Sequence, residues 1–312
     1  MRTRLILVST GMAVLLAFAL ALAPVDLRRA LGYMTSHPFE MAFALLAYTR
    51  AFALRAASWR PLITVRVPFA KLFSLLMGAL FLNHAAPARA GDLARVYALS
   101  RRWVPATEAA VSVILSRLVD LAGLLAVLVA AWTLGGSGAP EVSLPLLVVA
   151  GAAATLFILG RLKLPAFFGT RFGVVGRYAA RTRAALRKTT RADLLRSFAF
   201  AAPAWVLEAG ILLVVGRGLG LGLAPAQVVA ATCFAVLVAA VPLAPGALGT
   251  YETGMVAILL IFGVPAELAF AAAVTTHAVK FLYAFAAAPF ALGEGFAAVR
   301  KERQPDEAGV EV

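Results

Sequence analysis

The stretch AVSVILSRLVDLAGLLAVLVAAWTL, residues 110–134, decides the class of this protein because Arg117 and Asp120 lie inside an otherwise apolar run. The run is longer than the roughly 20 residues that an α-helix needs to cross a bilayer. Glu208 interrupts a second apolar run, 198–216, in the same way. A charged side chain at bilayer depth is costly unless it is paired, and it usually lines a path or a site. We therefore expect an integral membrane protein in which polar groups meet inside the membrane.

The composition supports the same class. Of the 312 residues, 62% are hydrophobic and 14% are charged, whereas soluble domains are about half apolar and a quarter charged. Long Ala, Leu and Val runs with little alternation argue against an outer-membrane β-barrel. The single cysteine, Cys233, excludes an intramolecular disulfide and a cysteine-cluster metal site. We find no catalytic triad, P-loop or zinc motif, so we expect no enzyme activity, cofactor or metal.

The chain is expected to form one transmembrane domain over residues 1–300, followed by a short polar tail at 301–312. The N-terminal run resembles a signal peptide, but Pro24 disfavours cleavage, so we interpret it as a retained first span. The apolar runs, separated by turn residues, fall at 5–23, 39–57, 67–82, 110–134, 143–160, 198–216, 226–241, 251–263 and 266–292.

The charge distribution predicts the topology. Ten of the 29 Lys and Arg residues lie in 161–196, against one acid, Asp193. The positive-inside rule makes this segment a basic cytoplasmic loop and places both termini in the cytoplasm. Such a loop also attracts anionic lipid, and in so apolar a chain we do not expect nucleic-acid binding. The protein is expected in the cytoplasmic membrane of a bacterium or archaeon as a multi-pass protein.

The same rule predicts two re-entrant hairpins. Residues 67–103 must begin and end inside, and residues 226–263 must begin and end outside, which leaves about six full spans. The fold expected is therefore an all-α polytopic membrane protein with two oppositely oriented helical hairpins, as in the inverted repeats of secondary transporters. The alternative is that 67–82 and the two short halves of 226–263 each cross the membrane fully.

The first candidate motif lies around Asp92. On a helix, Arg89, Asp92 and Arg95 share one face because they are three residues apart. An arginine presents a planar fork that suits a phosphate group, and Asp92 would orient the two guanidinium groups. The alternative is an interfacial helix whose arginines reach the lipid headgroups.

The second group is the set of charges inside the long apolar runs. Arg117 and Asp120 are three residues apart and can pair with each other, either as a structural ion pair or as a contact for substrate. Glu208 has no partner nearby in the sequence, so it needs one from another helix or is protonated. Lys280 is a further candidate inside a span.

The third motif is a break between 242 and 252. Pro242 and Pro245 remove backbone donors, and Gly246 and Gly249 permit tight turns. Unwound backbone at membrane depth is tolerated only where protein or water covers it. The helix that follows could direct its N-terminal amides at an anion, although Glu252 in its first turn also suits the helix dipole alone.

Taken in order, these motifs resemble the flippase-like membrane domain of lysylphosphatidylglycerol synthases, over about residues 5–295. The motifs are Pro87-x-Arg89-Ala-Gly91-Asp92-x-x-Arg95, Arg117-x-x-Asp120 and Pro242-x-x-Pro245-Gly246-x-x-Gly249-x-x-Glu252. The chain departs from that family at three positions. The family usually has glutamate where this chain has Asp92 and Ser116, and it usually has a second glycine where this chain has Ala247. The synthases carry their aminoacyl-transferase domain after the membrane part, so we do not expect that activity here.

The resemblance implies a flippase that moves an anionic phospholipid or a polyprenyl-phosphate-linked lipid between leaflets. The alternatives are a scaffold for a lipid-modifying enzyme and a transferase with a lipid-linked donor; a homo-oligomer or a lipid-synthesis partner is left open. The drive would be the lipid gradient or a proton carried by Glu208 or Asp120. The predicted path consists of Arg89, Asp92, Arg95, Arg117, Asp120, Glu208, Pro245, Gly246, Gly249, Glu252 and Lys280.

Overall fold

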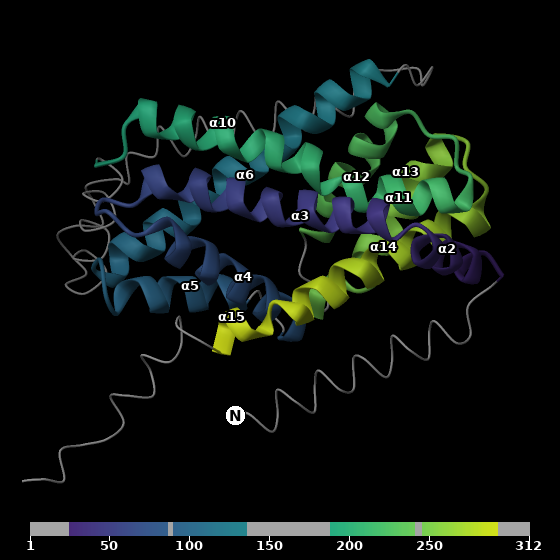
Figure 1. Cartoon of the computed structure of the whole chain (residues 1–312). Helices are drawn as coiled ribbons and strands as arrows, with labels where there is room; N and C mark the ends of the chain where they lie inside the picture. Colours follow the sequence, from purple (N-terminus) through teal and green to yellow (C-terminus); the bar gives the residue numbers. More distant parts are fainter. Residues whose placement is uncertain (1–24, 87–89, 136–187, 241–244, 293–312) are drawn as a thin grey trace, which may run out of the picture.

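The computed structural model describes residues 25–86, 90–135, 188–240 and 245–292, and every regular element within them is a helix. The helices form an elongated bundle, in which α3 (Pro38–Trp59) and α10 (Arg191–Glu208) run side by side along its length (Figure 1). Helix α6 (Ala106–Leu134) packs against α10. The short helix α2 (Val25–Ser36), which precedes α3, was not expected from the sequence.

Three helices of the described residues are long and apolar enough to cross a membrane: Ala106–Leu134, Arg191–Leu219 and Ala266–Phe290. The predicted runs 110–134 and 198–216 fall in the first two, and most of 266–292 falls in the third. The full count of about six spans stays a prediction. The runs 5–23 and 143–160, most of the basic loop 161–196 and the tail lie outside the described residues.

The hydrogen-bond pattern of the second long helix is irregular directly after Glu208. This helix consists of α10 and α11 (Gly210–Leu219), joined at Ala209, whose amide donates to the Val206 carbonyl oxygen at 3.3 Å. Pro203 has no amide hydrogen, so the helix also lacks the hydrogen bond that residue 203 would donate to the Ala199 carbonyl oxygen. Glu208 lies in the interior of the bundle and is only 5% exposed.

The first helical pair consists of α4 (Phe69–Ala85) and α5 (Ala90–Ser100), which lie against each other. The side-chain oxygen of Asn83 accepts a hydrogen bond from the Gly91 amide at 2.9 Å, and this contact closes the turn between them. A Cβ atom on Gly91 would collide with the carbonyl oxygen of Ala79. The close approach of the two helices therefore requires glycine at this position.

The second pair consists of α12 (Pro225–Ala239) and α13 (Thr250–Ile261), and a single turn of 3₁₀-helix, η2 (Pro245–Ala247), lies between them. The two pairs lie toward opposite ends of the bundle (Figure 1). Both have the helix–break–helix form expected for 67–103 and 226–263. That each pair enters and leaves on one side of a membrane stays a prediction.

Replacing Gly91 by alanine is expected to destabilise the protein by about 1–3 kcal/mol, the usual cost of overpacking. The physical reason is the collision of the new Cβ with the α4 backbone at Ala79. The measurement is the melting temperature of the purified protein in detergent. The matched control is Gly32→Ala in α2, where no atom lies within 4 Å of the added Cβ. Equal melting temperatures for the two variants would contradict the close packing of α4 on α5.

Candidate functional site

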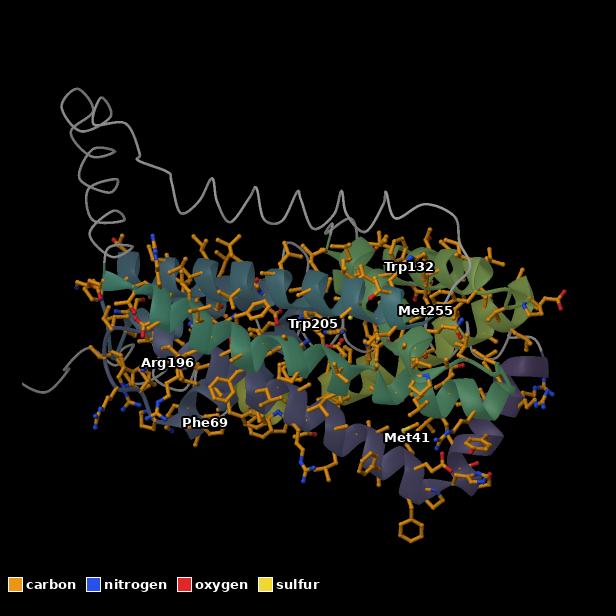
Figure 2. The ribbon with its side chains drawn as sticks, turned by 90° about the horizontal axis from the view of Figure 1, so that it is seen from above. Met41, Phe69, Trp132, Arg196, Trp205 and Met255 are labelled. Carbon is orange, nitrogen blue, oxygen red and sulfur yellow. The ribbon has the colours of Figure 1, made fainter. Side chains whose placement is uncertain are left out.

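A cavity of about 230 Å³ lies inside the bundle. This volume is far above the roughly 10–15 Å³ that one water molecule needs. Trp205, one of its lining residues, lies near the middle of the long axis, with Arg196 toward one end and Met41 toward the other (Figure 2). The cavity therefore lies far from both ends of the bundle.

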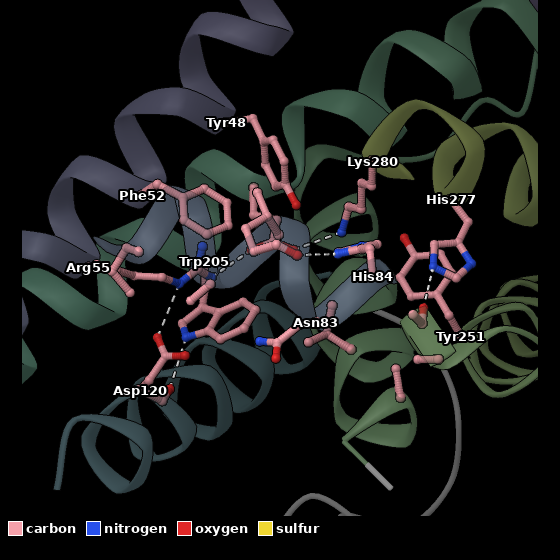
Figure 3. Close-up of a pocket in the computed structure, with 18 of the residues that line it drawn as sticks. Tyr48, Phe52, Arg55, Asn83, His84, Asp120, Trp205, Tyr251, His277 and Lys280 are labelled. Carbon is pink, nitrogen blue, oxygen red and sulfur yellow. Dashed lines mark hydrogen bonds and ion pairs between the residues drawn. The ribbon is translucent and has the colours of Figure 1, made fainter. Parts of the chain in front are cut away.

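The two breaks in the helical pairs meet at this cavity. Asn83, His84 and Ala86 line it from the end of α4, and Gly246 and Ala247 line it from the second break. The remaining wall comes from the long helices α3, α6, α10 and Ala266–Ala286 and from the shorter helices α4, α12 and α13. It carries both charged and aromatic side chains (Figure 3). Segments more than 150 residues apart in the sequence thus line the same polar cavity.

Four of the lining charges form one connected network. The Arg55 guanidinium contacts Asp120 through Nε–Oδ1 at 3.2 Å and Glu208 through a terminal nitrogen and Oε2 at 2.6 Å. Lys280 Nζ reaches the other oxygen of Glu208 at 2.8 Å. These residues come from α3, α6, α10 and α14 (Ala266–Ala286). Each buried charge therefore has an opposite charge at hydrogen-bonding distance, which is the condition for keeping it inside an apolar bundle.

Aromatic side chains hold the same network in place. The Arg55 guanidinium lies 4.2 Å from the centre of the Trp205 ring, and the Trp205 indole N–H donates to the Asp120 carbonyl oxygen at 2.9 Å. Lys280 Nζ lies 5.0 Å from the Tyr251 ring and 5.7 Å from the Tyr48 ring. Such cation–π contacts gain strength where water is excluded.

A second network is centred on Asp92 of α5. Its carboxylate accepts from Arg117 Nε at 3.0 Å and from a terminal nitrogen of Arg117 at 2.7 Å. Arg95 contacts Asp92 at 3.4 Å, donates to Ser116 Oγ at 3.0 Å and lies 3.9 Å from the Trp59 ring centre. Arg117 lines the cavity, whereas Arg95 is 2% exposed and does not. The structure thus places Arg95 and Asp92 behind Arg117.

The predicted pairing of Arg117 with Asp120 within one helix is wrong. Arg117 pairs with Asp92 of α5, and Asp120 pairs with Arg55 of α3. The physical reason is that neighbouring helices bring opposite charges to each residue, so neither depends on its own helix for a partner. Glu208 was expected either to have a partner on another helix or to be protonated. The structure gives it cationic partners on two other helices. Arg89 and Pro242 lie outside the described residues.

The second break is held by Glu252 and by His277 of α14. Gly246 and Gly249 have φ angles of 62° and 81°, and Ala247 has 60°, a conformation that disfavours an L-residue by about 1–2 kcal/mol. Glu252 Oε2 accepts from the Gly249 amide at 2.8 Å. The Gly249 amide at this helix N-terminus, which the sequence predicted as a donor to an external anion, is therefore already bonded to Glu252. Pro245 begins the 3₁₀ turn, and neither Gly249 nor Glu252 lines the cavity.

Sequence reasoning missed two residues of this site. Arg55 lies near the end of the predicted run 39–57 and begins the basic segment Arg55–Arg66. The positive-inside rule places this segment in the cytoplasm, so no role in the site was predicted for Arg55. An arginine inside an apolar run, here between Leu54 and Ala56, was the available signal, as it was for Arg117. His277 has no metal-ligand spacing, so the sequence marks it only as an ionisable residue inside a span. Its partner Glu252, 25 residues away, was not predicted.

The comparison with protein families gives one match. The model for the lysylphosphatidylglycerol synthase TM region covers residues 4–288, which include every residue that lines the cavity. Neither the curated proteins nor the solved structures with which the chain was compared contain a match. With almost the whole chain covered, and with three helices able to span a bilayer, this multi-pass membrane protein belongs to the family of the lysylphosphatidylglycerol synthase transmembrane region.

Proposed function

We propose that the protein moves the headgroup of an anionic phospholipid, or of a polyprenyl-phosphate-linked lipid, between the leaflets of the cytoplasmic membrane. The observation that carries this proposal is the central cavity, whose wall bears Arg55, Arg117 and Lys280 within otherwise apolar helices. Polar groups at such depth usually belong to a path for a polar substrate. Membership of a family named for a lipid synthase supports a lipid as that substrate.

The balance of charge favours an anion. Among the described residues, the two networks contain one more cation than acids: the cations are Arg55, Arg95, Arg117 and Lys280, and the acids are Asp92, Asp120 and Glu208. One formal positive charge is therefore left uncompensated among these residues, and a phosphate group would balance it.

Arg117 is the cation best placed to meet the headgroup. Its side chain is 38% exposed, whereas those of Arg55 and Lys280 are 10% and 5% exposed. A planar guanidinium that is already oriented by a carboxylate loses little freedom when it binds phosphate. In this mechanism Asp92 orients Arg117, and the Arg55–Glu208–Lys280 network forms the rest of the polar wall.

The size of the cavity limits what enters it. About 230 Å³ accommodates a headgroup but not two acyl chains, so the chains would remain in the lipid. The irregular backbone at the two breaks bounds the cavity on both sides, and a movement of either break would open it toward one leaflet. Broken helices at the substrate site are the usual arrangement in secondary transporters.

Arg117→Ala is expected to slow lipid exchange between leaflets by about tenfold or more, because a hydrogen bond to a charged group contributes about 1.5–3 kcal/mol. The assay uses liposomes that contain only this protein, with fluorescent phospholipids and a polyprenyl-phosphate analogue. The matched control is Arg102→Ala, which removes an exposed arginine from the turn after α5. Exchange at the wild-type rate in Arg117→Ala would rule out this headgroup site. A folded wild-type protein that exchanges no lipid would favour a scaffold or a transferase instead.

A pair of variants at Glu208 separates stability from transport. Glu208→Gln is expected to destabilise the protein by about 3–5 kcal/mol, because it leaves buried cations without their acid. Adding Lys280→Met removes one of those cations, and Arg55 keeps its contact with Asp120. The melting temperature of the double variant in detergent should therefore recover most of the decrease caused by Glu208→Gln. Lipid exchange should stay low in this folded double variant. Exchange at the wild-type rate would show that the network serves stability alone.

A further inference from the structure

Both ring nitrogens of His277 face hydrogen-bond acceptors. Nδ1 lies 2.7 Å from Oε1 of Glu252, and Nε2 lies 3.1 Å from the carbonyl oxygen of Gly246. His277 is 4% exposed, and its ring lies beside that of Tyr251 at a tilt of 34°, with ring centres 4.4 Å apart. Figure 3 shows His277 on the cavity wall beside Tyr251. Water therefore has little access to replace either contact.

Counting protons decides what this geometry requires. A backbone carbonyl oxygen only accepts, so Nε2 must carry a hydrogen to bond Gly246. The contact with Glu252 then needs a second hydrogen, either on Nδ1, which gives an imidazolium beside a carboxylate, or on Glu252 itself. In either case the pair is electrically neutral and holds one proton more than a neutral imidazole with a carboxylate.

We infer that His277 and Glu252 form a proton-binding site that fastens the second break to α14. When the shared proton leaves, the one remaining ring hydrogen stays on Nδ1, because there it faces the negative carboxylate. The lone pair of Nε2 then points at the Gly246 carbonyl oxygen, and this contact is lost. The break, which already holds Ala247 at a φ of 60°, is thereby released from α14.

The groups around the ring support a site that exchanges a proton. The second break itself has no charged side chain in its described part, 245–249. Arg217 of the neighbouring α11 is exposed and pairs with Glu40. Glu252 and Tyr251 of α13 contact the His277 ring. The other titratable and charged residues that line the cavity with it are His84 of α4, Glu208 of α10, Tyr48 and Arg55 of α3, Arg117 and Asp120 of α6, and Lys280 of its own helix.

The site is suited to couple transport to protons, a consequence that rests on the proposed function. Glu208 and Asp120, the carriers expected from the sequence, are each held by a cation in the network. Protonation of either acid would break a buried ion pair. His277 and Glu252 instead lie at the irregular backbone that bounds the cavity, where a single proton makes or breaks one contact.

The first test reads the proton directly and does not depend on lipid transport. Nitrogen-15 NMR of the full-length protein with labelled histidine distinguishes a doubly protonated ring from each neutral tautomer, and His277→Gln identifies the His277 signals. In the variant Glu252→Gln, the amide oxygen can still cap Gly249 while its N–H₂ donates to Nδ1, so a neutral ring can keep both contacts. As the pH is raised, we expect the wild-type ring to pass from the state that bonds both Glu252 and Gly246 to a neutral ring with hydrogen on Nδ1. The ring in Glu252→Gln should stay neutral with hydrogen on Nε2. A neutral wild-type ring with hydrogen on Nδ1 at every pH would overturn the inference.

The second test asks whether the proton controls the break. Lipid exchange in liposomes should rise by about tenfold, equivalent to about 1.4 kcal/mol, as the pH is raised through the transition seen by NMR. Exchange in Glu252→Gln should stay low and independent of pH. His277→Arg, which carries a permanent charge, should also lose the pH dependence. Exchange by the wild type with no pH dependence would overturn the coupling while leaving the flippase proposal intact, whereas no exchange at all would reject the flippase.

Discussion

The ion pairs between Glu208, Arg55 and Lys280 are the contacts on which the rest of this structure depends. A carboxylate at the centre of an apolar bundle is tolerated only where cations meet it. Here these cations come from α3 and α14, so the Glu208 contacts tie three helices together at one point. Glu208 lies in the interior of the bundle, and the network lines the cavity. The requirement to pair one charge thus also creates the polar space.

The features predictable from the sequence are those that depend on neighbours along the chain. Apolar runs fix where α6, α10 and α14 lie, and proline with glycine marks the break before Thr250. The partner of a buried charge depends instead on which helices pack together. Arg117 and Asp120 look like a pair in the sequence, yet each pairs with another helix, and Arg55 was overlooked because the positive-inside rule explained it as a basic end.

Ala247 shows how a departure from a family pattern can carry structural meaning. The resemblance leads one to expect glycine here, and the structure places this residue at a φ of 60°, where glycine is favoured. Other contacts must hold the backbone in this conformation. The bonds from His277 to Gly246 and from Gly249 to Glu252 lie on either side of it. The break is therefore held by a few polar contacts of its neighbours rather than by its own conformational preference.

A division of labour between the charges follows from these contacts. In the network around Glu208 each acid is paired with a cation, so its charges suit a permanent polar wall of the cavity. Arg117, oriented by Asp92 and partly exposed, is free to meet an anionic group. The pair of His277 and Glu252 lies at the least regular backbone, where one proton decides whether a contact exists. In the mechanism that we propose, the wall, the ligand contact and the proton site involve different residues around one cavity. A change in protonation would then move the break without breaking the ion pairs that hold the helices together.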